Sequence, residues 1–229
     1  MKTETTIDTQ DMAEAGMHLG HRTSKLNPKM GEFVVGIKNT VHVIDLEKTA
    51  TYLKKALDFI EEVSKNKQVL MLVGAKPPLK RLVKAIAEEM QVPYVTERWL
   101  GGTLTNFDIL SKRSLYLKTL ESEKESGQFE KYTKKEQLKK EKELVDLSNK
   151  FGGVKNMSKT PDAVFICDIV KDDLALKEAT AKGIKTIAIV DTNGDPSSVD
   201  FPIPANDDAI TSVKYILERV KAAFLKHKE

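Results

Sequence analysis

An α/β fold built on a parallel β-sheet is the fold class that this sequence predicts. From Gln68 onward, short apolar runs of strand length alternate with segments of helical periodicity, an alternation typical of parallel strands joined by helical crossovers. The apolar runs are nearly continuous, as in strands that are covered on both faces. The stretch 108–150 interrupts the alternation, because 20 of its 43 residues are charged. The 229 residues therefore suit one full-sized core with an insertion.

Upstream of this alternation we expect two short strands and a helix. The strands are Phe33–Val35 and Val41–Ile44, on either side of a turn at Lys38–Thr40. Asp45 is expected to cap a helix whose apolar stripe ends near Val63, with charged residues on its other face. This helix should pack on the sheet.

The alternating part of the chain contains five candidate strands and three candidate helices. The strands are Val69–Val73, Val92–Val95, Ala163–Cys167, Thr186–Val190 and a last short one at Phe201–Ile203. The helices run from Leu79 to Ala87, from Leu174 to Thr180 with Gly183 as a stop, and from Asp207 to Phe224.

The charged stretch 108–150 is expected to form a helical hairpin. Its leucines are three, four or seven residues apart, and Ser126, Gly127 and Gln128 lie between the two leucine-bearing arms. Two interpretations are open. The hairpin is either a charged insertion that faces only water, or a protruding arm that binds a partner, in the extreme case as a coiled-coil adaptor.

Charge and composition set the broad functional class. The net charge is only +3 and the isoelectric point about 8.7, so basic residues must gather locally if they recognise nucleic acid. Cys167 lies in an apolar run and is expected to be a small buried hydrophobe. Met1–Asp11 has no signal-like apolar run, and no segment reaches the roughly 20 apolar residues that cross a bilayer. We therefore expect a cytoplasmic protein without a membrane role.

Basic residues gather between His18 and Lys38, where Glu32 is the only acid. Glycines and a proline interrupt this segment, which is predicted to be a system of loops. Basic side chains on loops suit a phosphate backbone, which rewards charge without one fixed geometry, although an ordinary basic loop has the same composition. His18 and His21 have the spacing of a metal pair, but no cysteine or further histidine lies nearby in the sequence, so no metal is expected.

The only tryptophan lies in the stretch Arg98–Phe107, between a predicted strand and the charged insertion. Its paired glycines suit a close approach to phosphate, while Arg98 and Trp99 offer a charge and a stacking face. A nucleotide pocket, an RNA contact and a Trp99 that packs under the rim of the sheet are the open interpretations. Gly74–Pro78 lacks the glycine fingerprint of a dinucleotide fold, so no cofactor is expected and the RNA contact is favoured, through Arg98 more than Trp99.

Asp168, Asp191 and Asp195 each follow a predicted strand, at the edge where parallel sheets place their ligands. If they converged, they would hold magnesium for a phosphotransfer enzyme, which is the alternative function. Asp191–Pro196 is rich in turn formers, however, and carboxylates in such turns ordinarily cap backbone amides. The sequence also lacks P-loop, nucleophile-elbow and cysteine–histidine motifs, so we expect no enzyme.

Six ordered blocks of sequence are similar to one known family over almost the whole chain. They are His18–His21 with Asn27–Met30, His42–Thr49, Arg98–Phe107, Pro161–Ala163, Ala188–Asn193 and Ile203–Ile210. In these blocks the chain resembles the second protein of the bacterial small ribosomal subunit, the ribosomal protein S-two family.

The resemblance implies a flavodoxin-like, doubly wound parallel sheet in three α/β/α layers with an inserted helical coiled-coil hairpin. The core domain would comprise residues 1–107 and 151–229, and the hairpin residues 108–150. The family binds small-subunit ribosomal RNA and helps to seat the messenger-binding ribosomal protein one, and no catalysis is implied. The residues expected to contact RNA are His18, His21, Arg22, Lys25, Asn27, Lys29, Lys38, Arg98, Trp99 and Asn106.

Overall fold

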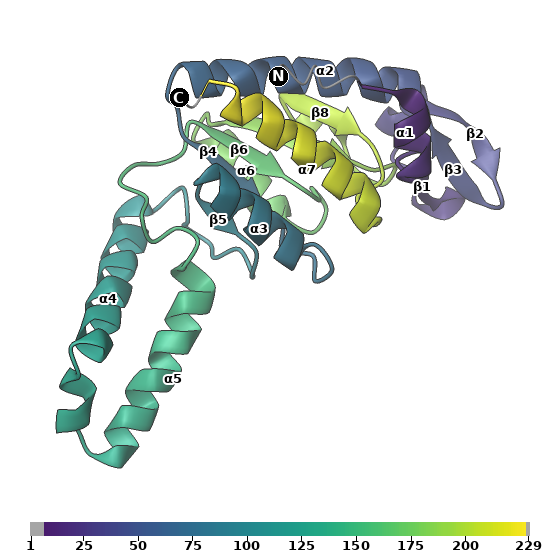
Figure 1. Cartoon of the computed structure of the whole chain (residues 1–229). Coiled ribbons are helices and arrows are strands. Elements are labelled where there is room, and N and C mark those ends of the chain that lie inside the picture. Colours follow the sequence, from purple (N-terminus) through teal and green to yellow (C-terminus); the bar gives the residue numbers. More distant parts are fainter. Residues whose placement is uncertain (1–6, 228–229) are drawn as a thin grey trace.

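The computed structural model describes residues 7–227, which form a body of two β-sheets with surrounding helices and an arm that projects from it (Figure 1). Our expectation of a cytoplasmic protein rests partly on Met1–Asp11, and residues 1–6 of this segment lie outside the described part. Among the described helices, none is long and apolar enough to cross a membrane.

Five parallel strands form the main sheet, as the alternating pattern predicted. They are β4 (Leu70–Val73), β5 (Tyr94–Val95), β6 (Ala163–Ile166), β7 (Lys185–Val190) and β8 (Phe201–Pro204). Their spatial order is β5-β4-β6-β7-β8. Numbered along the chain this is 2-1-3-4-5, the order of flavodoxin-type sheets, which reverses direction between β4 and β6. The carboxyl ends of the strands share one edge, where such sheets place their ligands.

Helices cover both faces of this sheet, because its central strands are apolar on both sides. The helices are α2 (Leu46–Lys65), α3 (Lys80–Met90) and α7 (Ile210–Leu225) on one face, and α6 (Asp173–Ala181) on the other. Leu72 and Phe165 belong to the core between the sheet and the helices α2, α3 and α7, whereas Val73 and Ile166 pack with α6. Asp45 caps α2 as predicted, since its carboxylate accepts the backbone N–H of Glu47 at 3.0 Å.

A second sheet of three antiparallel strands, in the order β1-β3-β2, precedes α2. The predicted pair is present as β2 (Val34–Lys38) and β3 (Val41–Ile44), and the two turn residues between them have positive φ. The prediction that the preceding segment contains only loops is wrong, because β1 (Leu19–Arg22) pairs with β3. Gly20 in β1 lies so close to the side chain of Thr192 that a Cβ would come within 2.5 Å of its methyl group.

Three further short helices in this region were not predicted. They are α1 (Thr9–Glu14) and the 3₁₀ helices η1 (Thr23–Lys25) and η2 (Pro28–Phe33). Each is six residues or shorter, so helical periodicity has no room to show in the sequence.

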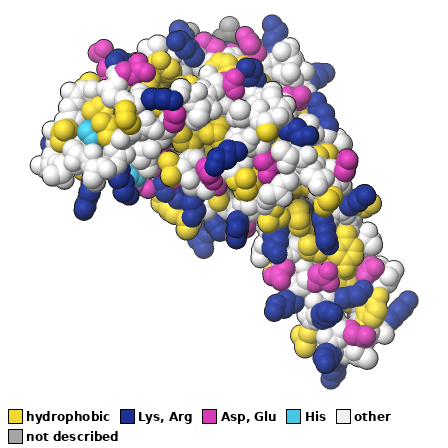
Figure 2. All heavy atoms as spheres, turned by 180° about the vertical axis from the view of Figure 1, so that it is seen from behind, with side chains coloured by type: hydrophobic (Ala, Val, Ile, Leu, Met, Phe, Trp, Pro, Cys, Tyr) yellow, Lys and Arg dark blue, Asp and Glu magenta, His cyan; other side chains and the backbone are white. Residues whose placement is uncertain are grey.

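The arm consists of α4 (Phe107–Glu125) and α5 (Lys134–Phe151), joined through the short η3 (Gln128–Lys131). Leu117 and Leu120 of α4 are buried, whereas α5, all of which is described, has no buried residue. Basic and acidic side chains are interspersed along the surface of the arm (Figure 2). The coiled-coil packing of these helices stays a prediction.

Polar contacts join the two helices of the arm along their length. The ammonium of Lys140 lies 2.8 Å from the carboxylate of Glu123. The hydroxyl of Tyr116 donates to Glu143 at 3.2 Å. Because the charge pair is partly exposed, it contributes only about 0–1 kcal/mol, and the buried leucines of α4 supply the apolar part of the contact.

The chain that returns from the arm is held against β5. The backbone N–H of Tyr94 donates to the carbonyl of Gly153 at 3.0 Å. A Cβ on Gly153 would collide with the carbonyl oxygen and the ring of Tyr94. Only glycine therefore allows the two backbones to approach this closely.

Gly153→Ala is expected to lower the free energy of unfolding by about 1–3 kcal/mol, because the added methyl group forces the returning chain away from β5. The matched control is Gly36→Ala, where a Cβ would meet nothing within 4 Å and where the change should stay within about 0.5 kcal/mol. Urea unfolding followed by circular dichroism measures both. Equal stabilities of the two variants would contradict the role of Gly153.

Candidate nucleic-acid interface

Arg22, Lys25 and Lys38 lie together at one end of the three-stranded sheet. Arg22 and Lys38 are both in register with Val41, so they flank the same residue of β3. Because neighbouring strands lie about 4.8 Å apart, the backbones of these two residues are about 10 Å from each other. Lys25 is in η1, directly after β1. All three side chains are exposed, and none forms an ion pair with another described residue.

Asn27 and Lys29, also predicted to contact RNA, are instead engaged within the protein. The side-chain oxygen of Asn27 accepts the backbone N–H of Lys29 at 3.1 Å. The ammonium of Lys29 lies 2.7 Å from the carboxylate of Asp195 and donates to the hydroxyl of Ser197 at 2.6 Å. This contact is the main reason why the pKa of Asp195 is lowered. The charge of Lys29 is therefore largely balanced by Asp195 within the protein.

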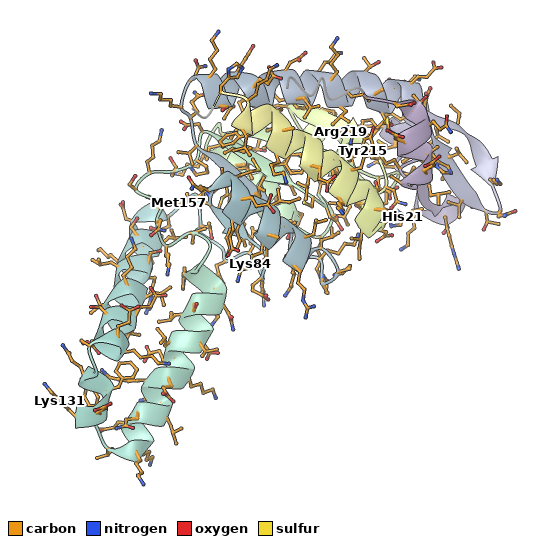
Figure 3. The ribbon with its side chains drawn as sticks, in the orientation of Figure 1. His21, Lys84, Lys131, Met157, Tyr215 and Arg219 are labelled. Carbon is orange, nitrogen blue, oxygen red and sulfur yellow. The ribbon has the colours of Figure 1, made fainter. Side chains whose placement is uncertain are left out.

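His21 lies near the start of α7 (Ile210), at the side of the body (Figure 3). Its Nδ1 lies 3.1 Å from the carboxylate of Asp191, and its Nε2 lies 3.5 Å from that of Asp208. Contact with Asp191 raises the pKa of His21, and burial opposes this effect. His18 is half-buried, and its backbone carbonyl accepts the N–H of Ile44 at 2.8 Å. Both histidines thus help to fix β1 in place.

Lys76 is the centre of a cluster of carboxylates at the edge of the main sheet. Its ammonium lies 3.0 Å from Asp168, 2.8 Å from Asp207 and 2.6 Å from Asp208. Burial lowers the pKa of Lys76, but the contacts with Asp207 and Asp208 outweigh it and leave the pKa raised. Burial and the neighbouring Asp168 raise the pKa of Asp207 to about 7.

Two of the three aspartates of the alternative enzyme reach this cluster, and the third does not. Asp168 contacts Lys76, and Asp191 contacts His21. Asp195 lies with Lys29 and caps its own turn by accepting the N–H of Ser197 at 2.9 Å. An ammonium group thus stands between carboxylates where the enzyme would place its magnesium.

One group of side chains within the described residues could hold a metal ion. His21, Asp191 and Asp207 offer ligand atoms that all lie within 4.8 Å of one another. An imidazole with two carboxylates is a donor set that suits zinc. The ammonium of Lys76, 2.8 Å from Asp207, repels a second cation at the same place.

The sequence interpretation missed Lys76, Asp207 and Asp208 as members of this cluster. Lys76 lies in the proline-containing turn after β4, which was considered only for its missing glycine fingerprint. Asp207 and Asp208 were assigned to the start of the last helix, but α7 begins at Ile210. The available signal was their position directly after the last strand, at the edge where ligands gather.

Glu178 of α6 holds the tryptophan loop, which we define as Arg98–Phe107. Its carboxylate accepts the backbone N–H groups of Gly102 at 2.7 Å, Leu104 at 2.9 Å and Thr105 at 3.1 Å. Burial raises the pKa of Glu178, but these hydrogen bonds prevail and leave it lowered. The backbone N–H groups of the glycine loop thus bind an anion, which is a carboxylate of the protein itself.

Trp99 is only 5% exposed and packs with Val73 and Val95. Its indole N–H donates to Glu178 at 3.3 Å. The ring therefore has no free face on which a base could stack, and the packing interpretation describes this residue. Arg98 and Asn106, at the two ends of the loop, are exposed.

The predicted RNA contacts thus fall into two separate places on the same edge of the sheet. The tryptophan loop follows β5, while Thr192, against which Gly20 of β1 packs, follows β7. These strands are three positions apart in the sheet, which corresponds to about 14 Å.

Glu178→Ala is expected to lower the free energy of unfolding by about 2–4 kcal/mol, because it leaves several backbone N–H groups of the tryptophan loop without an acceptor. Trp99 is the only tryptophan, so its fluorescence in a urea titration reports on this loop directly. Glu62→Ala, at an exposed position of α2, is the control and should change stability by less than about 0.5 kcal/mol. A Glu178→Ala protein as stable as this control would show that Glu178 does not stabilise the tryptophan loop.

A pH dependence is expected from Asp172, which is 3% exposed and accepts the N–H of Ala75 at 3.1 Å. Burial raises its pKa from the ordinary 3.8 to about 6. The native state therefore holds this proton more tightly than the unfolded chain, so stability falls as pH rises from about 4 to 6. Asp172→Asn removes this loss, which is worth up to about 3 kcal/mol. The free energy of unfolding of the variant should therefore rise relative to that of the unsubstituted protein between about pH 4 and pH 8. A stability difference that stays constant in urea titrations across this range would contradict the shift.

Known proteins are similar in sequence to this chain over nearly its full length. The family model described as Ribosomal protein S2 matches residues 12–226. The small ribosomal subunit protein uS2 of Marinobacter nauticus is 40% identical over 214 residues, which cover 93% of this chain and 86% of the relative. The protein of the same name from Helicobacter hepaticus is 40% identical over 220 residues, covering 96% and 83%. That of a Nitratiruptor species is 38% identical over 223 residues, covering 97% and 84%. A match of this extent means that the chain belongs to the ribosomal protein S2 family.

Proposed function

We propose that this protein is a structural constituent of the small ribosomal subunit, working in the cytoplasm, and that it binds small-subunit ribosomal RNA. One observation carries the RNA contact: Arg22, Lys25 and Lys38 stand together and exposed at the end of the three-stranded sheet, here called the small sheet, and none forms an ion pair with another described residue. Lys25 has only a longer-range electrostatic interaction, with Asp208. Relatives with the printed name of a small-subunit protein support the assignment to the ribosome. We assign no catalytic step to the protein.

Unpaired cations of this kind suit the phosphate backbone of a folded RNA. Each phosphate that they neutralise releases bound counterions, which drives binding and makes it depend on salt. The guanidinium of Arg22 can contact two oxygens of one phosphate, whereas Lys25 and Lys38 act as point charges. Lys29 adds its charge only by exchanging Asp195 for a phosphate.

The remaining predicted residues have supporting or secondary roles in this proposal. His18, His21 and Asn27 hold the strand and loop that carry the cations. Arg98 and Asn106 form a second contact at the tryptophan loop, and Trp99 sets the position of that loop from within the core.

We further infer that residues 108–150 are an inserted coiled-coil hairpin on a core of residues 1–107 and 151–229, and that the hairpin meets neighbouring ribosomal proteins. Leu115, Leu138 and Val145 support a partner contact, since they are 66%, 68% and 57% exposed. Recruitment of the messenger-binding ribosomal protein one is part of the same proposal and rests on the family resemblance.

Replacing Arg22, Lys25 and Lys38 together by alanine should weaken binding to small-subunit RNA, because three phosphate contacts are lost. The plot of log affinity against log salt should also flatten, by about 2–3 in slope. Filter binding of the full-length protein at several salt concentrations measures both quantities.

Two comparisons make this test specific. Lys54, Lys65 and Lys182 are exposed cations away from the small sheet, and their triple alanine variant should keep the original slope. Lys29→Ala should have a smaller effect than the loss of Lys25, since Asp195 already balances Lys29. If the two triple variants bound RNA equally well, the small sheet would not be the contact.

A further inference from the structure

A cleft of about 870 Å³ opens between the carboxyl edge of the main sheet and the base of the arm. Its walls come from the loop after β4, the tryptophan loop, the end of α5 and the loop after β6. Small-molecule sites in proteins typically measure about 300–1,000 Å³, so the cleft is large enough for a ligand well beyond a single ion.

The cleft lies where the order of the main sheet reverses. β4 and β6 are neighbours, and the connections from them lead to opposite sides of the sheet. Ala75 follows β4 and Lys171 follows β6, and both line the cleft. Flavodoxin-type sheets bind their ligands in the crevice at this reversal.

The charges that line the cleft are not balanced within it, although acids and bases are equal in number. Glu97 is paired with Lys80, and Asp173 is paired with Lys177, which lies outside the cleft. Asp172 is buried and accepts the N–H of Ala75.

Three cations of the lining keep their charge available. Arg98, Lys150 and Lys171 are exposed, and none forms an ion pair with another described residue. Asp146 and Asp172 are acids of the lining that form no such pair either, and Lys171 interacts electrostatically with Asp172. Three such cations face two such acids, so the cleft has a net positive charge at neutral pH that suits an anion.

The rest of the wall suits the uncharged part of a ligand. Leu100, Gly101 and Leu174 offer apolar surface, and Leu174 is 40% exposed. Asn149 adds an amide group that can donate and accept hydrogen bonds.

We propose that this cleft binds a nucleoside phosphate, with the phosphate among Arg98, Lys150 and Lys171 and the base and sugar along Leu100, Gly101 and Leu174. Side chains must hold the phosphate, because Pro77 and Pro78 leave the turn after β4 without the amide donors of a glycine-rich loop. The ligand is either a free nucleotide or an unstacked nucleotide of an RNA strand, which share this chemistry.

Isothermal titration calorimetry of the full-length protein tests the proposal. AMP, GMP, CMP and UMP are titrated separately, each beside its nucleoside, and inorganic phosphate is titrated alone. We expect at least one mononucleotide to bind more tightly than its nucleoside and than phosphate. Arg98→Gln and Lys150→Gln should each weaken this binding about tenfold or more, because each removes a charge-assisted hydrogen bond.

Two further variants separate the cleft from general charge effects. Gly101→Leu keeps every charge but adds bulk, and a Cβ at this position meets only Leu174, at 3.9 Å, so the variant should fold and lose the nucleotide. Lys182→Gln removes an exposed cation outside the cleft and should bind as the unsubstituted protein does.

Competition identifies the source of the nucleotide. If small-subunit RNA displaces the bound mononucleotide, the cleft receives an unstacked nucleotide of the strand, and if RNA and mononucleotide bind together, the ligand is a free nucleotide. Absence of mononucleotide binding at millimolar concentration, or equal binding by the Arg98→Gln, Gly101→Leu and unsubstituted proteins, would overturn the proposal. The RNA contact at Arg22, Lys25 and Lys38 is measured separately, so either proposal can fail without the other.

Discussion

Three aspartates from two distant parts of the chain approach the single ammonium group of Lys76 at the carboxyl edge of the main sheet. Two of them, Asp168 and Asp207, are buried, and buried carboxylates are tolerated only with a compensating charge. Lys76 follows β4, and these two aspartates follow β6 and β8, so one cation ties three strand ends together. The small sheet docks against the same cluster, because His21 reaches it from β1.

The main sheet could be predicted from the sequence, because strands buried on both faces need nearly continuous apolar runs. The contacts at its edge could not, since Lys76 and Asp207 are 131 positions apart and no local pattern records their meeting. β1 was missed for a different reason. A four-residue strand that contains Gly20 has the same local composition as a loop, and its pairing with β3 is decided by tertiary contacts.

The candidate site shows the same division between local and tertiary information. The sequence indicated a group of basic residues and a glycine loop suited to phosphate, but it did not indicate the partners that these segments have in the folded protein. Lys29 is balanced by Asp195, and the glycine loop is filled by Glu178, so neither is open to a ligand in the way its composition indicated. Which cations remain available, such as Arg22 and Arg98, follows only from the folded arrangement.

The bond between Tyr94 and Gly153 has a consequence for self-association. β5 is an outer strand of only two residues, and this bond already occupies an N–H that a second molecule would need for strand addition. The opposite outer strand, β8, contains Pro202 and Pro204, which have no N–H to offer. Both edge strands of the main sheet are thereby protected against edge-to-edge aggregation before the protein binds a partner.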